Sequence, residues 1–328
     1  MSIIGLDIGG TKCAVVKATD AGAIERTIRF GTTTSAETQE RLWRAVAELD
    51  PGPAPVFGIS CGGPLDSATG LILSPPNLPG WDRVPITAEL ERRFGGRAFL
   101  MNDANAGALA EWRFGAGRGT RNLVFLTYGT GMGAGVVCDG RLYEGANGNS
   151  GEIGHVRLSA DGPVGFNKAG SFEGWCSGGG LGRLAQAEAR KRGGRVAFNP
   201  GRIEDITARH LAQAAEAGDR LAIDLLAESG RRLGMALAII IDVLNPEVIV
   251  LGSVYSRARK WLEPHMRPVL EAEALPGSLA VCRVVPTALG EEIGSFAAVA
   301  IAVYHAGGFA RDVRGAVDSA LAPLAAGG

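Results

Sequence analysis

A run of alternating glycines, LTYGTGMGAG at residues 126–135, constrains the fold of this chain more than any other segment. Glycine has no Cβ and adopts positive φ readily, so successive backbone amides can turn toward one bound anion. The spacing of Gly129, Gly131 and Ala134 satisfies a loose dinucleotide-binding pattern, but that pattern requires a helix directly after the turn. Here β-branched residues lead instead into Asp139-Gly140 and a second apolar segment, which predicts a β-hairpin. The hairpin disfavours a dinucleotide site.

The beginning of the chain repeats this pattern. Residues 3–31 predict a three-stranded meander with a turn at residues 20–22. Both halves therefore open with a strand, a loop rich in Gly and Thr, and a return strand, which indicates an internal duplication with two loops facing each other across a cleft. The first loop, at residues 7–12, resembles a P-loop, but Thr11 interrupts the required spacing and a strand follows in place of a helix. The P-loop interpretation therefore fails.

The remaining segments alternate between helical and strand patterns, as expected of an α/β protein. Helices are expected over 36–49, 86–94, 177–192, 204–217, 219–243, 291–306 and 311–325, and strands over 56–60, 97–101, 248–251 and 281–285. The last apolar run before residue 252 is interrupted by Asp242 and by Asn245-Pro246-Glu247, which argues against a membrane span.

Charge and cysteine content narrow the class of partner. The 328 residues carry 33 basic and 34 acidic side chains, a net charge of −1, so nothing favours binding to nucleic acid or to an anionic membrane. Five scattered cysteines and the absence of an export signal predict free thiols in a cytoplasmic protein. Small molecules are the expected partners.

Several polar segments have both a structural and a functional interpretation. Asn102-Asp103 precedes an Ala-rich helical segment and could simply cap that helix. The loop SPPNLPGW at 74–81 could be a surface connector, with Asn77 in a plain turn. Gly252-Ser253 follows a strand, at the edge where open α/β sheets bind ligands.

Taken in order, these segments resemble the ROK family of bacterial sugar kinases and sugar-responsive repressors, which have the actin-like ATPase fold. Seven motifs carry the resemblance: LDIGGTK at 6–12, GISCGGPLD at 58–66, SPPNLPGW at 74–81, MNDANAGALAE at 101–111, LTYGTGMGAG at 126–135, GEIGH at 151–155 and PEVIVLG at 246–252. The resemblance implies a duplicated α/β fold of two domains around a cleft. We place the first domain at residues 1–116, completed by a helix at 308–328, and the second domain at residues 117–307.

The resemblance also implies an ATP site. Two loops would clamp the phosphates, Mg²⁺ would bind near Asp7 through water, and Gly252 with Ser253 would contact the nucleoside. The family usually has a second glycine where this chain has Ser253. The residues that match the ATP site are Asp7, Gly9, Gly10, Thr11, Lys12, Gly129, Thr130, Gly131, Gly133, Gly252 and Ser253.

Asp103 matches the family's general base, which takes the proton from the attacking sugar hydroxyl. This role is compatible with a place at a helix N-terminus, because the amide dipoles there keep a carboxylate ionised. The positions that match sugar contacts are Gly63, Asn77, Asn102, Asp103, Glu152, His155 and Glu173. Buried hydroxyls of a hexose need such a set of hydrogen-bonding partners.

One departure from the family concerns its structural zinc, which is held by the His of GEIGH and three cysteines. In this chain Val164, Phe166 and Ser171 stand at the cysteine positions, which leaves His155 alone. A structural zinc needs four N or S ligands, so we expect no zinc here, with apolar packing of Val164 and Phe166 in its place.

The resemblance and the residues together predict an ATP-dependent hexokinase that phosphorylates the 6-hydroxyl of a hexose, with glucose as the first choice. N-acetylmannosamine, N-acetylglucosamine and fructose stay open as substrates. A repressor is not expected, because only two residues precede the first strand and leave no room for a DNA-binding module. A catalytically silent sugar-binding protein is the alternative of another class. A homodimer is expected from the family.

Overall fold

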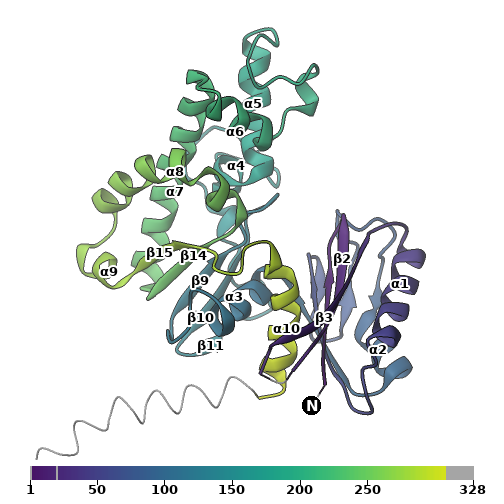
Figure 1. Ribbon diagram of the computed structural model, residues 1–328. Helices are drawn as coiled ribbons and strands as arrows, with labels where there is room; N and C mark the ends of the chain where they lie inside the picture. Colours follow the sequence, from purple (N-terminus) through teal and green to yellow (C-terminus); the bar gives the residue numbers. More distant parts are fainter. Residues whose placement is uncertain (1, 20, 308–328) are drawn as a thin grey trace, which may run out of the picture. The chain divides into compact units, whose positions relative to one another are not determined.

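A computed structural model describes residues 2–19 and 21–307, which form two compact units (Figure 1). Unit 1 contains the described residues of Met1–Arg121, Asp139–Gly148 and Ala288–Gly328, and unit 2 contains Asn122–Cys138 and Asn149–Thr287. The expected helix at 311–325, and with it the expected completion of the first domain by 308–328, lies outside the described residues.

Unit 1 is built on a five-stranded sheet whose order is β3-β2-β1-β4-β8. The expected meander is present: β1 pairs antiparallel with β2, and β2 pairs antiparallel with β3. On its other side β1 pairs parallel with β4, which pairs parallel with β8. The strands are β1 (Ile3–Ile8), β2 (Lys12–Ala18), β3 (Ile24–Gly31), β4 (Val56–Cys61) and β8 (Arg97–Asn102).

Helices cover both faces of this sheet (Figure 1). Alternate residues of a strand point to opposite faces, so Leu6 and Ile59 pack with α1 and α2 on one face. The glycines between such residues face α10, where a Cβ at Gly58 would lie 2.1 Å from the carbonyl oxygen of Ala298. The helices are α1 (Ser35–Glu48), α2 (Ile86–Phe94), α3 (Asp103–Phe114) and α10 (Ile293–His305), the last preceded by the 3-10 turn η3 (Gly290–Glu292).

The proline-rich loop at 74–81 belongs to the core of unit 1. Leu78 is 2% exposed and Trp81 is 1% exposed, and both pack in the cluster that contains the central strands. The interpretation of this loop as a surface connector is therefore wrong for its apolar residues, although Asn77 itself is exposed. The loop lies within a small sheet of β5 (Leu65–Asp66), β6 (Leu71–Ile72) and β7 (Val84–Pro85).

The second sheet has the strand order β11-β10-β9-β14-β15, the same arrangement as the sheet of unit 1, and its strands other than β11 belong to unit 2. The expected hairpin is confirmed, because β11 follows Asp139-Gly140 and lies beside β10 in the sheet, and β10 in turn pairs antiparallel with β9. Strand β14 pairs parallel with β9 and with β15. The equal order and direction of both sheets confirm the expected duplication. The strands are β9 (Leu123–Leu126), β10 (Ala134–Cys138), β11 (Arg141–Leu142), β14 (Val248–Leu251) and β15 (Arg283–Pro286).

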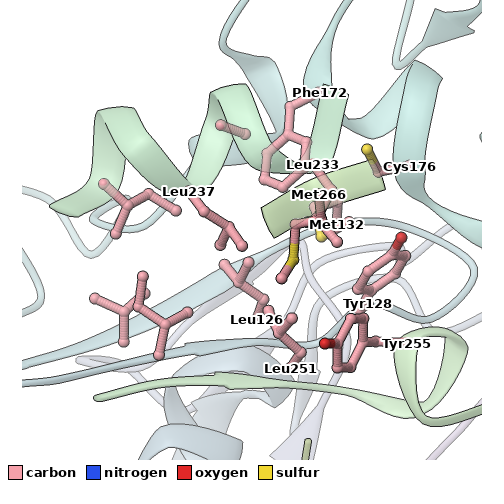
Figure 2. Close-up of a cluster of buried hydrophobic side chains, with 14 of the residues drawn as sticks. Leu126, Tyr128, Met132, Phe172, Cys176, Leu233, Leu237, Leu251, Tyr255 and Met266 are labelled. Carbon is pink, nitrogen blue, oxygen red and sulfur yellow. The ribbon is translucent and has the colours of Figure 1, made fainter. Parts of the chain in front are cut away.

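Long helices α7 and α8 cover the second sheet. Figure 2 shows Leu126 and Leu251 of the strands beneath Leu233 and Leu237 of α7, with Met266 of α8 in the same cluster. Smaller elements complete the unit. The helices are α4 (Phe172–Cys176), α5 (Gly178–Lys191), α6 (Ala208–Glu216), α7 (Arg220–Leu244), α8 (Ser253–Glu273) and α9 (Pro276–Val281), with the 3-10 turns η1 (Ile153–His155) and η2 (Ile203–Asp205) and the hairpin of β12 (Val164–Gly165) and β13 (Lys168–Ala169).

Helix α8 was not expected from the sequence. It contains Pro264 and Pro268, and proline in a helix interior removes a backbone donor and usually ends the helix. Its apolar residues, among them Leu262 and Met266, are completely buried against α7, and that packing outweighs the local penalty. Within residues 2–19 and 21–307, no helix combines the length and the apolar character needed to cross a bilayer.

Candidate active site

The carboxyl ends of three parallel strands gather the polar residues of unit 1. The register places Asp7 beside Ser60 and Cys61 beside Asn102, so strands β1, β4 and β8 end together. Open α/β sheets bind ligands at this edge, because side chains and loop amides from several strands converge there. Gly63 follows β4 at the same edge and is exposed. Unit 1 therefore brings together residues that are far apart in the sequence.

Asn102 and Asp103 divide the two roles that the sequence left open. The side-chain Oδ1 of Asn102 accepts a hydrogen bond of 2.8 Å from the backbone N–H of Asn105, so Asn102 is the N-cap of α3. Asp103 is the first residue of the helix and its side chain is exposed. A carboxylate at this position is stabilised in its ionised form by the helix N-terminus and stays accessible to a substrate.

Asp7 lies close enough to Asp103 for their charges to interact. Burial, and after it the charge of Asp103, raise the pKa of Asp7 to about 6 against the opposing charges of Lys12 and Arg29. Room for the Asp7 carboxylate is provided by a glycine of α10, since a Cβ at Gly294 would lie 2.1 Å from Asp7 Oδ2. Two neighbouring carboxylates with hard oxygen donors suit a hydrated divalent cation, so this chain's residues fit Mg²⁺.

The first glycine loop contacts the proline-rich loop of the same unit. Gly9 N donates to Lys12 O at 3.1 Å, which closes the turn between β1 and β2. A Cβ at Gly10 would lie 2.6 Å from the carbonyl oxygen of Asn77, so only glycine permits this approach. Thr11 and Lys12 are exposed beside it. Asn77, a candidate sugar ligand, is therefore held directly against the candidate phosphate loop.

The second glycine loop, residues 129–133, is held by hydrogen bonds from the start of α5 and by bonds close to the loop itself. The carbonyl oxygens of Gly129 and Thr130 accept from the N–H groups of Gly178 and Gly179, at 2.8 Å and 2.9 Å. Inside the loop, Gly129 N donates to Gly131 O, and Gly133 N donates to the hydroxyl of Thr127. Among the described residues, the amides of Thr130 and Gly131 have no hydrogen-bond partner, which leaves two adjacent donors for an anion.

Gly252 and the start of α8 lie against residues 126–128, which lead into this loop. Gly252 N donates to Leu126 O at 2.9 Å, and Val254 N donates to Tyr128 O at 2.9 Å. A Cβ at Gly252 would lie 1.9 Å from the carbonyl oxygen of Thr127, so the close approach requires glycine. Ser253 begins α8 and is thus the first residue of a helix next to the phosphate loop.

The GEIGH segment and Glu173 approach the same loop. Ala134 N donates to Gly151 O at 2.9 Å, and a Cβ at Gly154 would lie 2.2 Å from Met132 O. The carboxylate Oε2 of Glu173 accepts from Met132 N at 3.1 Å. Unit 2 therefore brings the candidate sugar ligands of this unit together with its candidate phosphate loop.

His155 and Glu152 form an exposed pair, in which His155 Nε2 lies 3.7 Å from Glu152 Oε2. The ring of Phe166 contacts the His155 ring edge-on, with 5.1 Å between ring centroids. No group of three or more His, Cys, Asp or Glu side chains suited to a metal occurs in the part of the chain that the structure describes. The residues around His155 do not fit a structural zinc, which needs four N or S ligands.

The expected apolar packing in place of the zinc is wrong, because Val164 is 44% exposed and Phe166 is 70% exposed. Hydrogen bonds order the loop at 156–172 in its place. Arg157 Nη1 donates to Ala169 O at 2.9 Å, and Trp175 Nε1 donates to Ser159 Oγ at 2.8 Å. The sequence contained all four residues, but their pairing depends on the fold of the loop.

Two structural supports of these elements escaped the sequence analysis. The Gly-rich start of α5 was treated only as a helix, although three glycines after Ser177 are a poor helix start and indicate close backbone contact. Glu111 of α3 is completely buried and accepts from the amides of Ala116, Ala288 and Leu289. The signal available in the sequence was that Glu111 is a charged residue within an Ala-rich helical segment.

Comparisons with known proteins agree with this geometry. Residues 3–304 match the ROK family. A glucokinase from Thermotoga maritima is 33% identical over 314 residues, which cover 94% of this chain and 99% of that protein. A ROK hexokinase from Thermus thermophilus is 30% identical, with a TM-score of 0.75 over 92% of this chain and 98% of that chain.

A third relative was solved with ligands. It is a ROK family glucokinase from Streptomyces griseus in complex with glucose and AMPPNP, 30% identical, with a TM-score of 0.72 over 91% of this chain and 98% of that chain. The family match extends over nearly the whole chain and agrees with the duplicated sheets found in both units. The chain therefore belongs to the ROK family and has the actin-like ATPase fold.

Proposed function

We propose that this protein is an ATP-dependent sugar kinase that transfers the γ-phosphoryl group to the 6-hydroxyl of a hexose, with glucose as the substrate. The observation that carries this proposal is the pair of carboxylates in unit 1. Asp103 is exposed at the N-terminus of α3, and Asp7 lies near it at the end of β1. A kinase needs one carboxylate as the base and one near the metal. The exposed Asp103 suits the base, and the recessed Asp7 suits the metal.

In this proposal Asp103 accepts the proton of the sugar hydroxyl as that oxygen attacks the γ-phosphorus. The bond between the γ-phosphorus and the bridging oxygen breaks, and ADP leaves with the electron pair. Thr130 and Gly131 offer two amides to the phosphates, and the first glycine loop offers the amides of Gly10 and Thr11 and the Lys12 ammonium. Positioning and neutralisation of charge supply most of the catalysis in phosphoryl transfer.

Asp7 would hold Mg²⁺ through water. Mg²⁺ held there would supply positive charge to offset that of the phosphates. The half-buried position of Asp7 at the carboxyl end of β1 suits a hydrated ion, because a water can span the distance between a recessed carboxylate and the phosphates.

The residues that match the family's sugar contacts are considered within each unit. Unit 1 supplies Gly63, Asn77, Asn102 and Asp103, and unit 2 supplies Glu152, His155 and Glu173. Asn102 uses its Oδ1 as the cap of α3, which leaves its side-chain NH₂ for a hydroxyl. Glucokinase relatives at 31–33% identity support glucose as the substrate.

The test is an ADP-release assay with ATP, Mg²⁺ and a panel of glucose, mannose, fructose, N-acetylglucosamine and N-acetylmannosamine. We expect the highest kcat/KM for glucose. A higher value for N-acetylmannosamine would reassign the substrate while leaving the kinase activity intact. Sugar binding by calorimetry with no ADP release from any sugar would identify a silent sugar-binding protein and overturn the proposal.

The family also suggests an oligomeric state and a location in the cell. We expect a homodimer, as in other members, to be tested by analytical ultracentrifugation. We also expect the protein to work in the cytoplasm, because no disulfide joins any of the five cysteines and ATP is a cytosolic substrate.

A further inference from the structure

Glu173 touches both candidate ligand regions of unit 2. Its side chain is partly exposed, and its Oε2 accepts from Met132 N in the second glycine loop at 3.1 Å. Within the described residues Oε1 has no hydrogen-bond partner, so one oxygen is committed to the loop and the other is available. A carboxylate can accept on both oxygens at the same time.

The two partners of this hydrogen bond are both fixed by the core. Met132 is 4% exposed and Phe172, which precedes Glu173, is 0% exposed, and the two side chains lie in the same buried cluster (Figure 2). Because the side chains of Met132 and Phe172 are both buried, the loop and the Glu173 carboxylate cannot move far apart. The hydrogen bond therefore joins two preorganised segments.

Glycines allow the backbone of Glu173 to lie this close to the loop. A Cβ at Gly154 would lie 3.4 Å from the Glu173 Cβ, and a Cβ at Gly165 would lie 2.9 Å from it. At Gly131 a Cβ would lie 3.1 Å from Glu173 Oε2. Glycines in three separate segments thus leave space for Glu173. A carboxylate on the open surface would not need this space.

Met132 is adjacent to the two amides that we assign to the phosphates. Because Met132 N is bound by Glu173, the peptide that follows Gly131 has a fixed orientation. The preceding peptides, which carry the amides of Thr130 and Gly131, are held by Gly178 N and Gly179 N, so the bond to Glu173 adds a further anchor to the same loop. Removal of the carboxylate would loosen the loop at Met132 and thereby the positions of both donors.

We propose that Glu173 is a positioning residue that holds the phosphate loop through Met132 N and couples occupation of the sugar site to the order of that loop. The coupling rests on the proposed function, whereas the anchoring of the loop does not. A sugar hydroxyl bound at Oε1 would order the same side chain that orients the loop. Each ligand would then bind more tightly in the presence of the other.

The experiment compares wild type with Glu173→Ala, Glu173→Gln and His155→Ala. Amide hydrogen exchange of residues 127–135 is measured without ligand, and AMPPNP affinity is measured by calorimetry without sugar. We expect Glu173→Ala to exchange faster at Met132 and to bind AMPPNP about three- to tenfold more weakly. Glu173→Gln keeps an acceptor oxygen and should fall between Ala and wild type.

His155→Ala is the matched control. It removes another candidate sugar ligand whose recorded contacts, to Glu152, Phe166 and Lys168, do not involve the loop. We expect it to raise the KM for glucose while loop exchange and AMPPNP affinity stay at the wild-type values. Glucose should slow exchange of residues 127–135 in wild type and have no such effect in Glu173→Ala.

Equal exchange at Met132 in wild type and Glu173→Ala would overturn the proposal. If Glu173→Ala does not fold, Glu173→Gln decides, because a neutral acceptor binds the amide more weakly and equal exchange would then contradict the anchor. Absence of ADP release from every hexose would refute the proposed kinase function instead. The ligand-free exchange comparison would still decide the role of Glu173.

Discussion

At the scale of single residues, the candidates for the proposed chemistry lie at the carboxyl ends of the strands. Asp103 is accessible at the start of α3, while its neighbour Asn102 caps the helix. The sequence placed both at a helix N-terminus but could not divide the roles, since either side chain can cap. The division depends on the backbone turn between β8 and α3.

We expect Asp103→Asn to lower kcat by about 100- to 10,000-fold, because an amide cannot accept the proton of the sugar hydroxyl. Glucose affinity, measured by calorimetry, should change little, since Asn keeps the shape and one acceptor. The control is Asp50→Asn, at an exposed position with φ of 48° that asparagine adopts at least as well as aspartate. A kcat near that of wild type would remove Asp103 from the role of base.

Gly179 is the residue whose replacement should disturb the phosphate loop most selectively. A Cβ there would lie 2.9 Å from the carbonyl oxygen of Thr130, a backbone atom that must move to accommodate it. We expect Gly179→Ala to lower kcat/KM for ATP by roughly 10- to 100-fold in a folded protein.

Gly277→Ala is the control for this substitution, because nothing lies within 4 Å of a Cβ added at that helical position. Both variants are compared by steady-state kinetics and circular dichroism. Unchanged kinetics in Gly179→Ala would mean that the loop tolerates the shift. The role assigned to α5 in holding the phosphate loop would then be wrong.

At the scale of elements, α3 is tied to the segment before α10 through Glu111. This completely buried carboxylate accepts from Ala116 N at 2.8 Å, Leu289 N at 3.2 Å and Ala288 N at 3.4 Å. Helix α10 also packs on the central strands β1 and β4, so Glu111 connects elements from both ends of unit 1.

We expect Glu111→Ala to lower the free energy of unfolding by about 2–4 kcal/mol, because buried amides lose a charged acceptor. Glu48→Ala should change it by less than about 1 kcal/mol, since Glu48 forms a solvent-exposed ion pair with Arg26. Urea unfolding followed by circular dichroism measures both. Similar losses of unfolding free energy in the two variants would contradict the stabilising role of the buried Glu111 hydrogen bonds.

Helix α8 carries an ion-pair network on one face. Glu263 lies four residues from Arg259 and from Arg267, with Arg267 Nε 2.8 Å from Glu263 Oε1. The hydrogen bond from Arg259, followed by the one from Arg267, lowers the pKa of Glu263 below its ordinary value of 4.5. The network is local to the helix and follows the i, i+4 spacing visible in the sequence.

Because the folded-state pKa of Glu263 lies below the unfolded value, its stabilising effect is present above about pH 4.5 and is lost as the pH falls through the folded-state pKa. We expect Glu263→Gln to lower the unfolding free energy by about 0.5–1 kcal/mol at neutral pH. The difference from wild type should vanish in strong acid. A difference that is independent of pH would assign the effect to packing.

At the scale of the whole molecule, the absence of cysteines at positions 164, 166 and 171 predicts a protein that does not depend on zinc. Treatment with EDTA, followed by removal of the chelator and addition of Mg²⁺, should leave kcat and Tm unchanged. Elemental analysis should find no stoichiometric zinc. A tightly bound zinc, or a large fall in Tm on chelation, would contradict this prediction.

Two sheets of equal strand order are the clearest agreement between sequence and structure. Local patterns predicted them, because a strand, a glycine loop and an Asp-Gly return are encoded by neighbouring residues. Helix α8 escaped prediction, since Pro264 and Pro268 argue locally against the burial that stabilises it. The packing of Val164 and Phe166 was predicted wrongly, because hydrophobicity alone does not say whether a neighbour exists to cover them.

The sequence by itself determined the duplicated meanders, the two glycine loops and the set of polar residues, since these depend on backbone freedom and short-range patterns. Only the tertiary structure decided how those residues work together. The cap at Asn102, the bond from Met132 to Glu173 and the seat of the phosphate loop on Gly178 and Gly179 join distant segments. Such contacts depend on packing distances of a few tenths of an ångström, which the order of residues along a chain does not specify.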